Sequence, residues 1–340
     1  METEQQNVDK WLDRAITEFS TNPLSTQLIR RLAREYTDSF SIAAIRHLET
    51  TEQAQADRFL TVLLLQQGSL FERISDPAQG SRERSLNLFK RLLAVDPSFD
   101  VKLARMLPDR SGVNHSEAYR GARAGRTLDI LDETSVGRHL LPVLSHLVNS
   151  PDPSTCATAT LFVGHRLKSP QWAAKQLDRS DNRVRANAVE SLWGLETEPA
   201  RHLLERCLDD ESNRVAGNAL VGLHIIGTPG IHDEIDRLIH ETKAEFRATA
   251  AWAMGRMNDP AMAPQLTALV RDQNKWVRSI ALRSLLNIRL SAPLDHAAAL
   301  QVEPTVVVVP EPEQVISQQV PARVFHLQLD GASFSSMGAR

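Results

Sequence analysis

Apolar side chains recur along the middle of the chain at spacings of three and four residues, which indicates amphipathic helices rather than strands. The pattern also repeats as a whole, because four segments align without gaps at an interval of 31 residues. They read NRVRANAVESLWGL, NRVAGNALVGLHII, AEFRATAAWAMGRM and KWVRSIALRSLLNI, and begin at Asn182, Asn213, Ala244 and Lys275. Counted from Val184 in the first unit, the apolar columns lie at offsets 0, 4, 8 and 11. The column at offset 4 is alanine throughout: Ala188, Ala219, Ala250 and Ala281.

A second apolar stripe lies between these segments, with Leu204, Ile235 and Leu266 at equivalent positions. Its spacing suits a helix of about three turns. Each unit is therefore predicted to be a helix A, a tight turn, a helix B and a connection that carries turn residues such as Pro199. One unit alone exposes an apolar face, so stacking of units is what buries it. Upstream, the segment from Ala118 predicts an earlier helix B, and those from Gly137 and Ser154 predict a further helix A and helix B.

The two ends of the chain differ from this middle part. Residues 8–110 have helical spacing but no 31-residue register, so they are predicted to be degenerate repeats or a capping helical domain. After about Leu290 the helical period stops and a Pro-rich stretch follows. Within it, Thr305–Val309 and Ala322–Leu329 are candidates for short strands. The predicted domains are thus a helical region at 1–112, a repeat solenoid at 113–290, and a linker with an extended tail at 291–340.

The stretch GRMNDPAMAPQLTALVRDQNKWVRSIALRSLLNI strongly resembles HEAT-like repeats of the phycobilisome-lyase type. The signature of that family is a glycine, an Asp-Pro turn, helix A, an acidic turn and a Val-Arg pair that opens helix B. The matching residues are Gly255, Asp259, Pro260, Asp272, Val277 and Arg278, with one extra residue between the glycine and the aspartate. Earlier units match in part, since Arg185 and Arg247 keep the arginine and Ala216 replaces it.

The resemblance covers about residues 137–290 and implies an all-α fold, a right-handed α-solenoid of HEAT-like helix pairs. In solenoids of this family, helix B typically lines the concave side. The resemblance is specific for fold and weak for function, because such repeats serve many unrelated partners.

The amino-acid composition limits the classes of protein to which the chain can belong. The chain has 340 residues, of which 42% are hydrophobic and 24% charged, as in folded soluble proteins. A net charge of −3 argues against a chain whose main task is to coat nucleic acid. The polar, acidic N-terminus lacks the apolar stretch of a signal peptide, and the apolar run Leu60–Leu65 is too short for a membrane span. We expect a cytoplasmic protein with neither nucleic acid nor membrane as a partner.

Candidate chemistry is sparse. Cys156 and Cys207 fall at apolar helical positions and are interpreted as small buried side chains. No two of the eleven histidines lie three or four residues apart, so no helix face offers two ligands for zinc. There is also no glycine-rich phosphate loop and no nucleophile elbow. The sequence therefore predicts no catalytic residue, no cofactor and no metal site.

The arginines one residue past the first apolar column, Arg185, Arg247 and Arg278, point beside the core toward the next unit. Carboxylates occur in the adjoining turns, among them Asp210 and Asp272. We predict Arg–Asp pairs that join successive units.

The opposite face of each helix B carries the candidate partner-binding residues. Offsets −1, +3, +6 and +10 from the first apolar column point away from the core. Aromatic and Arg side chains are enriched at binding hot spots, so a face rich in Trp, Arg and Asn resembles a recognition surface. The predicted residues are Arg183, Asn187, Arg214, Asn218, Trp252, Arg256, Trp276, Arg283 and Asn287.

Two functions fit these observations. The first is a non-catalytic scaffold or adaptor that binds a protein or peptide partner on the concave face. The second is an enzyme on the same repeats, either a bilin lyase or a DNA-repair glycosylase. A glycosylase needs a basic concave channel and a catalytic carboxylate, and the mixed charges of the predicted face count against it.

Overall fold

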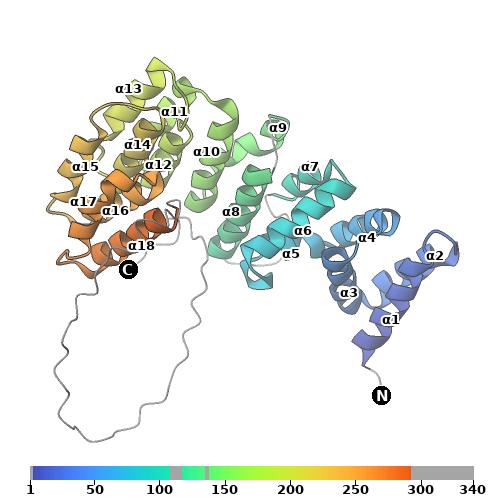
Figure 1. Ribbon diagram of the computed structural model, residues 1–340. Coiled ribbons are helices and arrows are strands. Elements are labelled where there is room, and N and C mark those ends of the chain that lie inside the picture. Colours follow the sequence, from blue (N-terminus) through green and yellow to red (C-terminus); the bar gives the residue numbers. More distant parts are fainter. Residues whose placement is uncertain (1–2, 108–116, 135–137, 292–340) are drawn as a thin grey trace, which may run out of the picture. The chain divides into compact units, whose positions relative to one another are not determined.

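The computed structural model describes residues 3–107, 117–134 and 138–291. The predicted strands at 305–309 and 322–329 and most of the predicted tail lie outside these residues. The described part of the chain contains helices and connections, without a strand. This confirms the predicted all-α solenoid of paired helices (Figure 1).

The N-terminal region precedes the regular repeats in the sequence and consists of helices that pack against one another. Helix α1 packs against α3, α3 against α6, and both α5 and α6 pack against α8. Their bounds are α1 Glu4–Thr17, α2 Leu24–Glu35, α3 Thr37–Thr50, α4 Ala54–Gln67, α5 Ser69–Ser75, the short 3-10 helix η1 Pro77–Gln79, α6 Arg82–Val95, α7 Phe99–Ala104 and α8 Glu117–Thr134.

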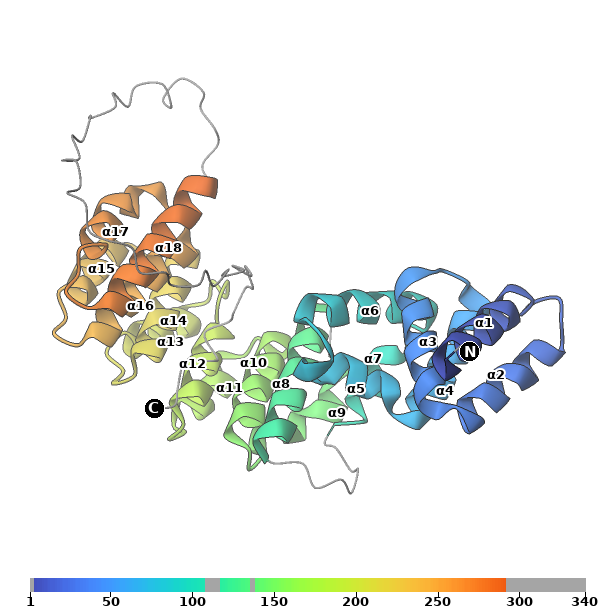
Figure 2. The ribbon, with the colours of Figure 1, turned by 90° about the horizontal axis from the view of Figure 1, so that it is seen from below.

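The helix-B layer consists of α8, α10, α12, α14, α16 and α18, each packed against the next (Figures 1 and 2). The bounds are α10 Pro153–Leu167, α12 Asn182–Glu190, α14 Asn213–Ile225, α16 Ala244–Met257 and α18 Lys275–Ser291. Each of these later helices is preceded by its helix A, which packs against it. The helix-A elements are α9 Leu141–Leu144 with the 3-10 helix η2 Ser145–Asn149, α11 Pro170–Leu177, α13 Glu198–Cys207, α15 Ile231–Ile239, and η3 Pro260–Met262 with α17 Ala263–Leu269.

The predicted apolar columns form the core of these units. The four alanines at offset 4, represented by Ala219, have no exposed surface. Leu204, Ile235 and Leu266 of helix A are also fully buried. Since α12, α14, α16 and α18 each have a fully buried alanine at this position, neighbouring helices can approach closely there. A larger side chain would overpack this seam.

One helix differs from its sequence pattern. The spacing predicts a helix from Asn182 to Leu195, but α12 ends at Glu190. The hydroxyl of Ser191 donates to the carbonyl of Ala188 at 2.7 Å, and Gly194 has a φ of 73°. A serine that bonds back to the preceding turn competes with the helical ladder, and glycine tolerates the left-handed conformation that ends it.

Candidate binding surface

Two Arg–Asp pairs join neighbouring units, as predicted. Arg185 of α12 donates to both carboxylate oxygens of Asp210 at 2.9 and 3.2 Å, and Arg247 of α16 does the same to Asp272 at 2.7 and 3.0 Å. The hydrogen bond from Arg247 lowers the pKa of Asp272 below its ordinary value. Arg247 also donates to the carbonyls of Glu241 and Thr242. Each arginine thus ties the turn of its own unit to the turn of the next one.

The arginine row is interrupted in the unit between these two. Ala216 stands where Arg185 and Arg247 stand in their units, and Glu241 occupies the position of Asp210 and Asp272. Glu241 instead lies 3.7 Å from Arg237 of helix α15. Arg278, in the last unit, donates to the carbonyls of Asp272 and Gln273 at 2.8 and 3.0 Å.

Asparagine amides hold successive B helices together. Asn187 donates to the carbonyl of Ala157 in α10 at 2.8 Å, and Asn218 donates to that of Ala186 in α12 at 2.9 Å. Asn218 is 8% exposed. These two predicted site residues therefore lie in the seams between B helices, with their amides engaged by the neighbouring helix.

Tryptophans flank α14 on both sides. A Cβ added to Gly222 would lie 2.8 Å from Cδ1 of Trp193, and one added to Gly217 would lie 3.5 Å from Cζ3 of Trp252. The Trp193 indole thus occupies space that a side chain at Gly222 would need, and the Trp252 indole lies against α14 beside Gly217. The indole N–H of Trp193 donates to the carbonyl of Asn218 at 2.8 Å. Both rings are partly exposed, so each has an anchored edge and a surface available to a partner.

Charged side chains lie next to Trp193 and Asn218. The guanidinium of Arg256, on α16, lies 5.7 Å from the centre of the Trp193 ring, within cation–π range. Glu190 of α12 accepts a hydrogen bond from Asn218 at 3.3 Å. Burial raises the pKa of Glu190, although the positive charge of Arg256 opposes this shift. Arg256, Trp193, Asn218 and Glu190 therefore form one connected group across α12, α14 and α16.

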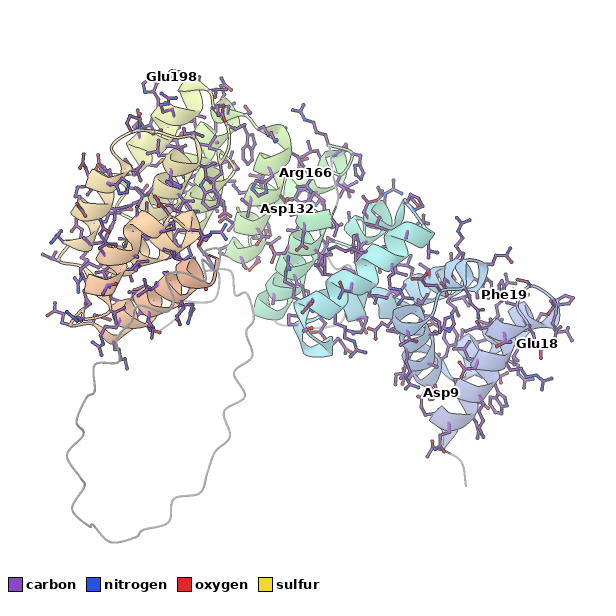
Figure 3. All side chains as sticks on the ribbon, in the orientation of Figure 1. Asp9, Glu18, Phe19, Asp132, Arg166 and Glu198 are labelled. Carbon is purple, nitrogen blue, oxygen red and sulfur yellow. The ribbon has the colours of Figure 1, made fainter. Side chains whose placement is uncertain are left out.

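A second set of titratable groups lies next to Glu190, on α8 and α10. Burial raises the pKa of Asp129 to about 6, and the charges of Asp132 and Glu190 add to the effect. Burial alone would also raise the pKa of Asp132, but hydrogen bonds and charges from His165 and Arg166 outweigh it and lower the value. Figure 3 shows Asp132 and Arg166 side by side where α8 meets α10.

The nine predicted residues fall into three groups. Asn218 and Arg256 belong to the group around Trp193, and Trp252 lies against the same helix, α14. Trp276, Arg283 and Asn287 lie on α18, where Trp276 is partly buried and the other two are exposed. The remaining three lie elsewhere on α12 and α14: Arg183, Asn187 and Arg214.

Sequence reasoning missed Trp193, Asp129, Asp132 and His165. Trp193 was missed because it lies between two of the repeated apolar positions, Leu192 and Leu195, and because α12 ends before it. The two aspartates lie three residues apart on α8, a spacing that places both on one helix face. Their proximity to Glu190 depends on how the units stack and has no signal in the sequence.

No metal site emerges from the described residues, in which no group of three His, Cys, Asp or Glu side chains is suitably clustered. None of the described helices combines the length and apolar character that a membrane crossing requires.

A family model described as HEAT repeats matches residues 233–307. This confirms the resemblance to HEAT repeats, and the match begins in α15 and includes α16–α18. No curated protein matches the chain. Among solved structures, human deoxyhypusine hydroxylase in complex with glycerol is similar at 17% identity and a TM-score of 0.31, over 76% of this chain and 99% of that one. A likeness at this level supports no conclusion about function.

Proposed function

We propose that this HEAT-repeat chain is a non-catalytic scaffold or adaptor that binds a protein or peptide partner along its helix-B layer. The observation that supports this most is a set of three partly exposed tryptophans: Trp193 just after α12, Trp252 on α16 and Trp276 on α18. Arg256 and Arg283 are exposed on the same two helices, α16 and α18. Trp and Arg provide most of the binding energy at many protein interfaces. Rigid packing of Trp193 and Trp252 against α14 lowers the entropy lost when a partner binds.

The helix-A side of two neighbouring units, formed by α13 and α15, offers a contrast. Apart from Pro199, the exposed side chains of α13 and α15 are polar or charged, among them His202, Glu205, His232 and Asp236. Figure 3 labels Glu198, which begins α13 and is exposed. Such a face is typical of a solvated outer surface. In the unit of α15 and α16 the aromatic groups thus lie on helix B, whereas in the unit of α11 and α12 helix A also carries a partly buried tryptophan, Trp172.

The proposal is tested by affinity capture from the cells in which the protein is made. The test variant combines Arg256→Ala with Arg283→Ala, which removes two exposed cations, including the one over the Trp193 ring, and leaves the contacts of the tryptophans with α14 in place. The matched control combines Arg206→Ala with Arg271→Ala, two exposed cations outside the helix-B helices. We expect the test variant to bind the captured partner about tenfold more weakly, and the control to bind as the natural chain does.

Both variants should keep the circular dichroism spectrum and the melting temperature of the natural chain, because exposed substitutions have small effects on stability. Equal capture by the test variant and the control would refute binding on the helix-B layer.

An enzyme on the same repeats is the second candidate, and one observation favours it. Asp129, with its pKa of about 6, lies within electrostatic range of Glu190. Carboxyl groups with raised pKa values are common at active sites, where they transfer protons near neutral pH. A glycosylase of this kind would bind duplex DNA at low salt and release a damaged base. Failure of the full chain to retain alkylated or abasic duplex DNA at low salt would remove this candidate.

A further inference from the structure

A groove of about 530 Å³ lies along the turns that precede the B helices, on a different part of the surface from the tryptophans. Asp181 and Arg183 come from the first turn of the series, Ser212 from the second and Lys243 from the third. These turns are 31 residues apart, so the groove crosses the N-terminal ends of α12, α14 and α16. Side chains from three consecutive units thus meet in one groove.

The N-termini of α14 and α16 lack the side-chain cap that α12 and α18 have. In α12 the N-cap Asp181 accepts from the backbone N–H of Arg183 at 2.8 Å, and in α18 Asn274 accepts from that of Trp276 at 2.9 Å. The N-cap of α14, Ser212, accepts no such bond. The N–H groups of a first helical turn point outward and carry partial positive charge, and they favour an anion where no cap is present.

Ser212 itself needs a partner. The residue lines the groove and is only 7% exposed, and its hydroxyl has no hydrogen-bond partner among the described residues. Buried hydroxyl groups are rarely left in this state. An oxyanion in the groove would provide the acceptor that this hydroxyl lacks.

Both signs of charge lie at this position: the carboxylate of Asp210 accepts from the backbone N–H of Ser212 at 2.8 Å, and cations stand on either side. Lys243 is exposed, and its ammonium lies 5.9 Å from the centre of the Phe246 ring. The guanidinium of Arg183 is 41% exposed and donates to Asp181, whose carboxylate is thereby occupied. Burial lowers the pKa of Arg214, and the nearby charge of Arg183 lowers it further, which reflects the closeness of two cations.

The acidic side chain on the other side of the groove does not block it. The carboxylate of Glu211 lies 3.4 Å from Arg185, and its side chain is 89% exposed. Such a side chain can turn into solvent at little cost, because an exposed ion pair contributes little. The groove can therefore accept an anion between Ser212, Lys243 and Arg183.

We propose that this groove binds a phosphoryl group carried by the protein partner, so this inference rests on the proposed function. A phosphoryl group brings close to two negative charges and three acceptor oxygens, which suit a helix N-terminus, a hydroxyl and two cations. The groove, at about 530 Å³, has room for the phosphoryl group and for the residue that carries it. The net charge of −3 does not suit a polyphosphate backbone.

The site is tested first with inorganic phosphate on the full chain, at constant ionic strength with chloride as reference. We expect phosphate to raise the melting temperature, because a ligand that binds only the folded state stabilises it. The rise should be larger at about pH 7.5 than at about pH 5.5, since the second pKa of a phosphoryl group is near 6.

Two variants locate the binding. Ser212→Asp places a carboxylate where Asp181 stands in α12, so it should raise the melting temperature in chloride and abolish the response to phosphate. Lys243→Gln should weaken phosphate binding roughly threefold or more. The matched control is Lys275→Gln at the start of α18, which Asn274 already caps, and it should respond as the natural chain does. No response in the natural chain, or an equal response in all four proteins, would overturn the site.

A second arm distinguishes a phosphoryl group on the partner from free phosphate. The captured partner is treated with phosphatase and offered again to the natural chain and to Ser212→Asp. We expect phosphatase to weaken binding to the natural chain and to have no effect on the variant. Binding of inorganic phosphate together with unchanged binding of the treated partner would overturn the partner assignment. Neither arm alters the test of the helix-B layer, which uses Arg256 and Arg283.

Discussion

The hydrophobic core of residues 8–163 and that of residues 173–288 are built from different side chains. The four largest fully buried side chains all lie in the first core: Phe40, Phe89, Phe99 and Phe162. The second core contains many fully buried alanines and has its aromatic rings at the edge, where Trp193 and Trp252 are partly buried. Large side chains fill the gaps between the helices of the first region, whereas alanines allow the B helices of the second region to stack closely. This difference explains why the 31-residue register is found only in the second region.

The largest effect is expected from truncation in the first core. Phe89→Ala removes a ring that is fully buried and lies 5.5 Å from the ring of Phe99. We expect it to lower the free energy of unfolding by about 3–5 kcal/mol, because the surrounding helices cannot close the cavity. Urea unfolding of the full chain measures this. The counterpart is Phe246→Ala in the second region, where the ring is only partly buried, and an equal loss there would show that the two cores do not differ in this way.

The second effect concerns the pairs that join units. Arg247→Ala leaves Asp272 without its partner in a turn where both side chains are at most 9% exposed. We expect a loss of about 3 kcal/mol, mostly from the unpaired carboxylate. Arg278→Ala, at the equivalent exposed position of the last unit, should cost less than about 1 kcal/mol. Similar losses in both variants, measured by urea unfolding, would show that the Arg247–Asp272 pair does not hold the units together.

The third effect tests the close packing of the second core. Ala219→Leu inserts a larger side chain at a position with no exposed surface. We expect a destabilisation of about 1–3 kcal/mol, since the seam between helix A and helix B has no room to expand. Ala261→Leu, at an exposed position, is the control and should be close to neutral. A neutral Ala219→Leu would mean that the alanine column reflects something other than close approach.

The smallest effect is a pH dependence with opposite signs in the two regions. The pKa of Asp129 is raised to about 6, so the folded chain binds its proton more tightly than the unfolded chain does. This carboxyl therefore reduces stability as the pH rises from about 4 to 6, and Asp129→Asn should stabilise by about 1 kcal/mol above that range. The pKa of Asp272 is lowered, so its stabilising contribution is present above about pH 4 and is lost as the pH falls.

Unfolding measured across this pH range separates the two aspartates. Asp129→Asn should show its benefit only near neutral pH, and Asp272→Asn should show its cost there. A benefit of Asp129→Asn that persists at about pH 4 would show that charge is not the cause.

The sequence could predict those features that repeat. The buried positions Val184, Ala188 and Leu192 could be predicted because equal spacing places equivalent residues in equivalent surroundings. The Arg–Asp pairs could be predicted from the same 31-residue register. The early end of α12 could not be predicted from the sequence, because it depends on which hydrogen bond Ser191 makes. The proximity of Glu190 to Asp129 could not be predicted either, because distances between side chains of different units depend on how the helices stack.

The candidate site was predictable only in part. The spacing placed Asn187 and Asn218 on the face away from helix A, and they do lie there, but that face meets the neighbouring B helix. Periodicity within one helix shows which residues share a face, and it does not show whether another helix covers that face. The exposed part of the surface, around Arg256 and Arg283, could be predicted from the sequence because both are long cations at offsets that point away from the core.

Site-specific photo-cross-linking in the native cells tests the central claim most directly, which is that the helix-B layer binds a protein partner. A photoreactive residue replaces Arg256 on α16 in one protein and His202 on the exposed face of α13 in another. The account predicts a discrete cross-linked species from position 256, and none of that mass from position 202. The same species from position 202 and none from position 256 would contradict it.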